Sequence, residues 1–175
     1  MSPRTRIAWL ALFATAMGWL EAVVVAYLRA IIGLAHGESM PSVEGIMGRF
    51  HQFPWLLSIE QGREVATMVM LGSVAWLGGH RVPSRFGAFL MIFGIWDLAY
   101  YLGLVAMVGW PKSLLDMDLL FLIPAHPWWY QPVWIPMLIS CGMIVFGARL
   151  VAKPLESSAE RRSTIGAGTA SLTRG

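Results

Sequence analysis

Long apolar segments are the feature of this 175-residue chain that most restricts its fold. A helix needs roughly 20 mostly apolar residues to cross the hydrocarbon core of a bilayer. Four segments meet this requirement, and the predicted spans are residues 7–34, 63–79, 86–108 and 132–151. The second span is short and starts polar, so its start is the least well defined of these boundaries. The first 16 residues resemble a signal peptide, but the apolar run continues well beyond them, which favours a retained first helix.

The composition agrees with a membrane protein rather than a soluble one. Hydrophobic residues make up 57% of the chain, charged residues 13%, and the mean hydropathy is +0.61. A soluble domain is about a quarter charged, and one with so little charge would expose apolar patches and aggregate. We therefore predict a single all-α domain over residues 1–155, a polytopic four-transmembrane-helix bundle. The single cysteine, Cys141, excludes a disulfide and is predicted to be a buried packing residue.

The distribution of Lys and Arg predicts the orientation of this bundle, because cytoplasmic loops carry more of them. With both termini inside, the cytoplasmic side holds nine: Arg4, Arg6, Arg81, Arg85, Arg149, Lys153, Arg161, Arg162 and Arg174. The outer side holds four: Arg29, Arg49, Arg63 and Lys112. We expect the bacterial cytoplasmic (inner) membrane, a lipid bilayer as the main partner, and no nucleic acid. Residues 156–175 are small and polar, which predicts a disordered cytoplasmic tail.

The two outer loops differ in kind. Residues 35–59 are mixed in character and are expected to hold a short interfacial helix. Residues 111–136 contain an apolar stretch too short to span, followed by closely spaced prolines that prevent a regular helix. This Pro/Trp-rich segment is predicted to be an interfacial or re-entrant piece over the outer mouth, either a lid or a structural plug. Aromatic anchors are expected at the same interface: Trp55, Trp110, Trp128, Trp129, Tyr130 and Trp134.

Three acidic residues lie inside predicted spans, on three different helices: Glu21, Glu64 and Asp97. A lone charge near the bilayer centre costs about 2.5–3.5 kcal/mol, so three would cost roughly 8–10 kcal/mol, comparable to the stability of a whole domain. Compensation is therefore required. It can come from shared protons or a cation, or from Arg29 and Arg63. The estimated depths of the three acids overlap, which predicts one cluster in the outer half of the bundle.

Helical spacing indicates which way these side chains face. In the first span, small residues recur every four positions: Ala14, Gly18, Ala22 and Ala26. Such a stripe allows another helix to approach closely, as in self-association or in a larger membrane complex. Glu21 borders this stripe and therefore faces protein. Asp97 lies four residues before Tyr101, on the same helix face. Glu60 and Glu64 flank Arg63 at a helix entrance, where carboxylates are favoured by the helix dipole.

These patterns predict a ligand-binding or ion-binding site in the outer half of the bundle. Its residues are Glu21, Arg29, Glu60, Arg63, Glu64, Asp97, Tyr101 and Asp118. Intramembrane ionisable residues commonly mark pathways and sites. The alternative is a buried ion-pair network that only fixes helix register. No catalytic residue is assigned, and whether the protein is an enzyme stays open.

Several familiar kinds of chemistry lack their sequence signals. All four histidines (His36, His51, His80 and His126) fall in loops, which disfavours a haem held between helices. There is no HExxH, Gly-rich phosphate loop, GxSxG or EF-hand loop. We predict no metal site and identify no cofactor. The remaining metal possibility is a site assembled from Glu21, Glu64, Asp97 and an outer histidine.

Four runs carry a resemblance to a known family: EAVVVAYLR, EQGREVATMVML, FGIWDLAYYLGL and GWPKSLLDMDLLFLIP. They resemble a family of small, functionally uncharacterised bacterial membrane proteins, over most of residues 18–124. The resemblance implies a compact multi-helix membrane protein and brings no activity with it. The runs contain all eight predicted site residues and also Tyr100.

Three functions are compatible with the sequence. The first is a protein that binds or translocates a proton, a cation or a small polar ligand near the outer face. The second is a non-catalytic accessory subunit of a larger membrane complex. The third is a small membrane enzyme that acts on a lipid or a quinone-like substrate, with the carboxylates as acid and base.

Overall fold

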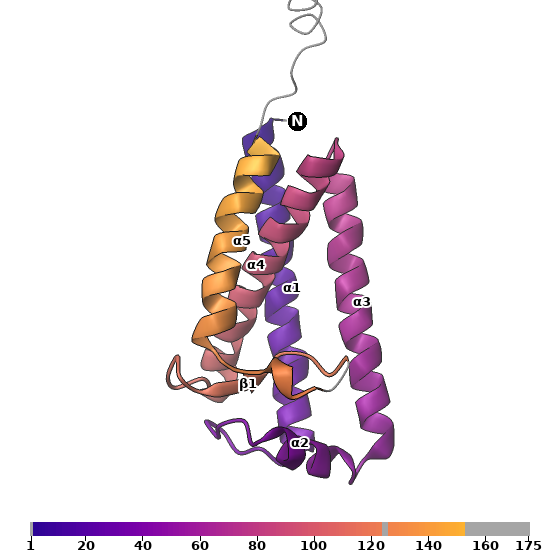
Figure 1. The fold of residues 1–175 in the computed structure, drawn as a ribbon, viewed down its shortest axis with the longest axis vertical. Helices are drawn as coiled ribbons and strands as arrows, with labels where there is room; N and C mark the ends of the chain where they lie inside the picture. The colour runs from indigo at the N-terminus through magenta and orange to yellow at the C-terminus, as the bar shows by residue number, and fades with distance from the viewer. Residues whose placement is uncertain (1, 124–125, 153–175) are drawn as a thin grey trace, which may run out of the picture.

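The computed structural model describes residues 2–123 and 126–152, and within them the chain forms five helices and one small sheet (Figure 1). The helices are α1 (Pro3–Ile31), α2 (Val43–Phe50), α3 (Pro54–Gly78), α4 (Val82–Val108) and α5 (Trp134–Ala152), and the shorter elements are β1 (Met117–Leu119), the 3-10 turn η1 (Pro127–Trp129) and β2 (Tyr130–Pro132). The tail predicted over residues 156–175 lies outside the described residues.

Local sequence explains where the long helices begin and end. Ser2 caps α1, its hydroxyl accepting a hydrogen bond from the Thr5 backbone N–H, and a proline occupies the first turn of α1, α3 and α4. Gly109 ends α4 in the left-handed conformation with φ of 66°, where glycine has no steric penalty. These signals set the length of each helix without reference to tertiary packing.

The four long helices run from one end of the molecule to the other (Figure 1). The start of α1, the end of α5 and the α3–α4 connection lie at one end, which we call the terminal end. At the other end lie α2 and the described parts of residues 109–133, which we call the cap. Both described chain ends therefore lie on the same side of the bundle.

Small residues bring α1, α4 and α5 close together. A Cβ added at Gly18 of α1 would lie 2.3 Å from the Trp96 carbonyl oxygen of α4, and one at Gly94 would lie 2.5 Å from the Ser140 carbonyl oxygen of α5. The predicted close approach to the stripe is therefore present, but the neighbour is α4 of the same chain. The stripe residues Ala14, Gly18 and Ala22 are buried there, so they offer no surface for the self-association we predicted. Of the four, Ala26 alone keeps partial exposure.

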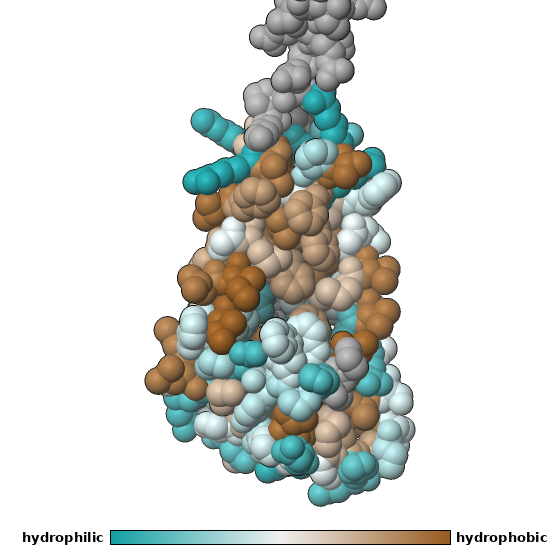
Figure 2. Space-filling model, viewed as in Figure 1, coloured by the Kyte–Doolittle hydropathy of each residue, from teal (hydrophilic) through white to brown (hydrophobic). Residues whose placement is uncertain are grey.

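Three of the described helices, α1, α4 and α5, are long and apolar enough to cross a membrane. Their outer surfaces carry large exposed apolar side chains, including Leu12, Leu20, Leu102, Leu138, Val145 and Phe146. Figure 2 shows apolar side chains over the middle of one face, with hydrophilic ones at the terminal end and around the cap. Cys141 is exposed on α5, so its predicted burial was wrong, because α5 turns this face away from α4.

Three sequence predictions change in detail. α3 is not among the three helices that are long and apolar enough to cross a membrane. It begins at Pro54, nine residues before the predicted start at residue 63, because the helix continues through the charged turn around Glu60. The fold is mostly helical, but β1 and β2 pair antiparallel with Asp118 opposite Gln131, which the all-α prediction omitted. Trp110, predicted to be an interfacial anchor, is fully buried.

Candidate functional site

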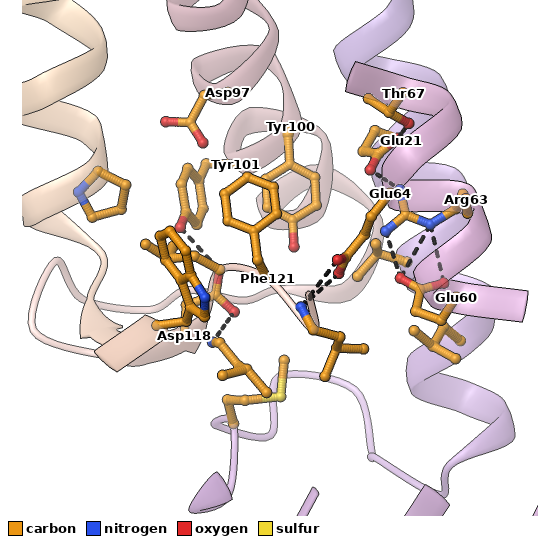
Figure 3. A pocket seen from close by; sticks show the side chains of 18 of the residues that line it. Glu21, Glu60, Arg63, Glu64, Thr67, Asp97, Tyr100, Tyr101, Asp118 and Phe121 are labelled. Atoms are coloured by element: carbon orange, nitrogen blue, oxygen red, sulfur yellow. Dashed lines mark hydrogen bonds and ion pairs between the residues drawn. The ribbon is translucent and has the colours of Figure 1, made fainter. Parts of the chain in front are cut away.

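A cavity of about 240 Å³ lies between the four long helices and the cap. Side chains from α1, α3, α4, α5, α2 and the β1 segment line it. All eight predicted site residues are among them: Glu21, Arg29, Glu60, Arg63, Glu64, Asp97, Tyr101 and Asp118. Figure 3 labels all of them except Arg29. The fold thus brings the eight residues predicted from the sequence to one place from four segments of the chain, α1, α3, α4 and β1.

Arg63 of α3 is the centre of the first polar group in this cavity. Its guanidinium forms an ion pair with Glu21 of α1 and a second one with Glu60, one turn earlier on α3 (Figure 3). The Arg63 Nε donates to both Glu60 carboxylate oxygens at 3.1 and 3.0 Å. The Thr67 hydroxyl donates to the other oxygen of Glu21 at 3.2 Å. One cation thus bridges two acids, and this bridge ties α3 to α1.

Glu64 follows Arg63 in sequence but makes no ion pair with it among the described residues. Its two carboxylate oxygens accept the Leu122 backbone N–H at 2.9 and 3.0 Å (Figure 3). The Gln61 side chain, one turn earlier on α3, donates to the Leu122 carbonyl oxygen at 3.0 Å. α3 therefore holds both polar groups of one residue in the cap.

Asp118 of β1 is almost fully buried, with 2% of its surface exposed. The Tyr101 hydroxyl donates to its Oδ2 at 2.9 Å, and the Leu119 backbone N–H donates to its Oδ1 at the same distance. Burial raises the pKa of Asp118 from 3.8 to about 6, while the two hydrogen bonds and the charge of Arg29 act in the opposite direction. Tyr101 was predicted to share a face with Asp97, but its hydroxyl is used by Asp118.

Asp97 of α4 has a single hydrogen-bond donor among the described residues. The Ser140 hydroxyl of α5 donates to its Oδ2 at 2.7 Å. Its other carboxylate oxygen has no described partner, and the side chain lines the cavity with 8% of its surface exposed. Like Asp118, Asp97 forms no ion pair with any described cationic side chain.

Arg29 of α1 is buried at the border between the cavity and the cap. Its guanidinium donates to the Glu38 carbonyl oxygen and lies over the Trp110 ring, 4.7 Å from the ring centroid. Arg29 was one of the two cations expected to compensate the acids. It forms no ion pair among the described residues, because the fold surrounds it with a carbonyl, a thioether and an indole instead.

Four further polar residues of the cavity were not predicted: Thr67, Trp96, Tyr100 and Ser140. Thr67 was within reach of the sequence argument, because it continues the inward face of α3 marked by Glu60 and Glu64. Ser140 lies in a uniformly apolar run and carries no such signal. The Tyr100 hydroxyl points into the cavity without a hydrogen bond to any described residue (Figure 3), and the Trp96 indole N–H is likewise without a described partner.

The charge around the cavity is unbalanced. Five carboxyl groups face two guanidinium groups, and one of those, Arg29, is engaged with neutral partners. Aromatic rings supply much of the remaining wall, including Phe93, Trp96, Tyr100, Phe121 and Trp129. No three His, Cys, Asp or Glu side chains in the described part of the chain are arranged to hold a metal ion. The cavity can thus accept positive charge and hydrogen-bond donors from a ligand or from protons.

Comparison of the chain with protein-family models, curated proteins and solved structures finds no match. The resemblance noted from the four sequence runs stays a prediction, and function rests on the geometry of the cavity.

Proposed function

We propose that this protein is a four-span membrane protein that binds or translocates a proton, a cation or a small polar ligand in the cavity near its outer face. The observation that carries the proposal is the surplus of carboxyl groups, five against two guanidiniums, around one cavity. Buried acids must share protons or meet positive charge, because an isolated buried charge is expensive. A ligand site supplies that charge reversibly.

The alternative of a network that only fixes register accounts for part of the site. It explains Arg63, which bridges Glu21 and Glu60. It does not explain why Asp97 and Asp118 line an open cavity without a described cationic partner. A register-fixing network would gain more from closing this space, since protein interiors otherwise pack with few voids.

Two features support α3 as the fourth span. Its 25 residues extend about 37 Å at 1.5 Å per residue, longer than a hydrocarbon core of roughly 30 Å. Its charged residues face the cavity, while Val65, Val69 and Leu77 are exposed on its other faces. An even number of spans with both termini on the cytoplasmic side also agrees with the shared terminal end (Figure 1) and with the excess of Lys and Arg there.

The accessory-subunit hypothesis loses the feature that supported it. Its docking surface was the small-residue stripe on α1, and α4 covers most of that stripe. We therefore place ligand binding first.

The test is a stability screen of the purified full-length protein in mild detergent. Na⁺, K⁺, Mg²⁺, Ca²⁺, small amines and neutral polyols are added at pH 5 and pH 8, and the unfolding temperature is measured. At least one compound, or the proton itself, is expected to raise it by several degrees in the wild type but not in Asp97→Asn. Glu44→Gln is the control, because Glu44 is exposed in the cap and does not line the cavity. Identical responses of the wild type and Asp97→Asn to every condition would contradict the proposal.

A further inference from the structure

Within the proposed function, on which this inference rests, we propose that the ligand is a small organic ammonium ion, bound between the Asp97 carboxylate and the aromatic wall of the cavity. Three observations lead to it. The polar groups that have no described hydrogen-bond partner lie on the α4 side of the cavity, the charge available there is negative, and aromatic rings form much of the remaining wall.

The two sides of the cavity differ in what they leave unused. On the α3 side, Glu21 and Glu60 share Arg63, and Glu64 holds the Leu122 N–H. On the α4 side, the second oxygen of Asp97 has no described partner, although only 8% of the surface of this residue is exposed. The Tyr100 hydroxyl and the Trp96 indole N–H, next to it on α4, also lack described partners. The α4 side of the cavity therefore offers a ligand a carboxylate oxygen, a hydroxyl and an indole N–H that have no described partner.

The charge of these groups excludes an anion and disfavours a bare metal ion. Both guanidiniums that line the cavity already have partners, so neither is free to receive a carboxylate or phosphate. Ca²⁺ and Mg²⁺ take six or more oxygen ligands and Zn²⁺ takes four, and the described residues do not bring even three His, Cys, Asp or Glu ligands together. A single positive charge with few hydrogen-bonding requirements fits one carboxylate.

The aromatic rings fit the organic part of such an ion. Trp96 and Tyr100 lie nearly parallel, with 18° between their planes and 6.4 Å between their centroids. Phe121 from the cap lines the same cavity and contacts Trp129 edge-on. The face of an aromatic ring attracts a cation, and quaternary ammonium groups are recognised by such rings. A carboxylate together with several rings therefore selects a cation that also has an apolar surface.

The volume limits the size of the ligand. At about 30 Å³ per water molecule, a 240 Å³ cavity holds roughly eight waters, or a compact organic molecule of about ten non-hydrogen atoms. This is below the range of about 300–1,000 Å³ for pockets that take drug-sized ligands. Benzyltrimethylammonium matches both the size and the chemistry and serves as the probe.

The experiment is calorimetric titration of the full-length protein in mild detergent at pH 7.5. Benzyltrimethylammonium is compared with its neutral isostere neopentylbenzene and with benzenesulfonate as the anion. Wild-type protein is expected to bind the ammonium probe at least tenfold more tightly than the isostere and not to bind the sulfonate. Asp97→Asn is expected to weaken binding of the ammonium probe at least tenfold while leaving the isostere unchanged. Glu44→Gln, which removes an acid outside the cavity, is expected to bind as the wild type does.

A second variant keeps the test decisive if Asp97→Asn does not fold. Phe121→Leu changes the aromatic wall from the cap side, outside the long helices, and should weaken binding of the ammonium probe severalfold. Equal affinity for the probe and its isostere, or binding of the sulfonate, would overturn the inference. So would an Asp97-dependent response to Na⁺ or to protons without probe binding, which leaves the proposed function intact. If neither the probe nor any condition of the stability screen acts through Asp97, both proposals fail.

Discussion

α1 and α3 both pack against α4, but they do so by opposite means. α1 meets α4 through residues with almost no side chain, so that Gly18 lies directly against the Trp96 carbonyl and Ala22 against Gly103. α3 keeps one continuous inward face, and that face changes character along its length. Near the terminal end it is apolar, with Leu71 and Ala75, and near the cap it is polar, with Glu60, Glu64 and Thr67.

The difference shows how a bundle can keep a polar cavity without losing its fold. Close backbone contact gives α1 and α4 a fixed geometry that does not depend on charge. The polar half of α3 is instead positioned by Arg63 and by its hydrogen bonds to the cap. Position along α3 thus decides whether the helix contributes to the apolar core or to the site. Four substitutions test this division, in order of expected effect.

Arg63→Met should be the most destabilising, since it leaves the buried Glu21 and Glu60 without their shared cation. Removal of one partner from a buried ion pair costs about 3–5 kcal/mol. The free energy of unfolding, measured by titration with a denaturing detergent, should fall by about this amount. Adding Glu21→Gln should restore part of it. Arg4→Met, at an exposed position of α1, is the control and should change stability by less than about 0.5 kcal/mol. A neutral effect of Arg63→Met would remove the distinction between the two interfaces.

Asp118 should make stability depend on pH in the acidic range. Because its pKa is raised in the folded protein, the folded state binds the proton more tightly, and stability falls as the pH rises from 3.8 through about 6. The loss contributed by this group approaches about 3 kcal/mol, at 1.36 kcal/mol per pKa unit. Unfolding measured between pH 4 and pH 7 should show a weaker decline in Asp118→Asn than in the wild type. An identical pH profile in both proteins would contradict the assignment.

Gly18→Ala tests the α1–α4 interface. The added methyl group would lie 2.3 Å from the Trp96 carbonyl oxygen, so the two helices must separate, at a cost of about 1–3 kcal/mol. Gly72→Ala on α3 is the matched control, because a Cβ there meets nothing within 4 Å and stability should be unchanged or slightly higher. Thermal unfolding of both variants in the same detergent measures the difference. Similar melting temperatures would show that the contact is not tight.

Thr67→Val should have the smallest effect, because it removes one hydrogen bond to Glu21 and keeps the ion pair with Arg63. The expected loss is about 1.5 kcal/mol by the same detergent titration, the lower end of the range for a hydrogen bond to a charged group, because this bond is long at 3.2 Å. A loss as large as that of Arg63→Met would mean that Glu21 is held mainly by Thr67.

The length of the apolar segments predicts much of the fold, but several details cannot be predicted from it. The ranges of α1, α4 and α5 were nearly right, because apolar runs of about 20 residues are typical of helices long enough to cross a membrane. The start of α3 was missed because the charged turn from Glu60 to Glu64 separates its apolar first turns from the main apolar run, although Pro54 is a typical first-turn residue. The sheet was missed because strands of three residues are too short to show alternation.

The shared location of the site residues around one cavity could be predicted for an energetic reason. A charge in an apolar span needs compensation, so Glu21, Glu64 and Asp97 had to face one another or a common space. The partner of each acid was much less predictable. Glu64 is bonded to a backbone N–H and Asp97 to a serine hydroxyl, and neither kind of group stands out from the apolar sequence around it.

Leu122 couples the cap to α3 through both of its backbone polar groups. Its N–H donates to Glu64 and its carbonyl accepts from Gln61, so one residue of the cap is hydrogen-bonded to neighbouring turns of one helix. The cap cannot be lifted from the cavity alone without breaking these bonds and leaving a buried carboxylate with no partner. Any opening that preserves them must carry the polar half of α3 along. Displacement of the cap at Leu122 is therefore coupled to displacement of α3, the one long helix that has no close small-residue contact with the bundle beside the cavity.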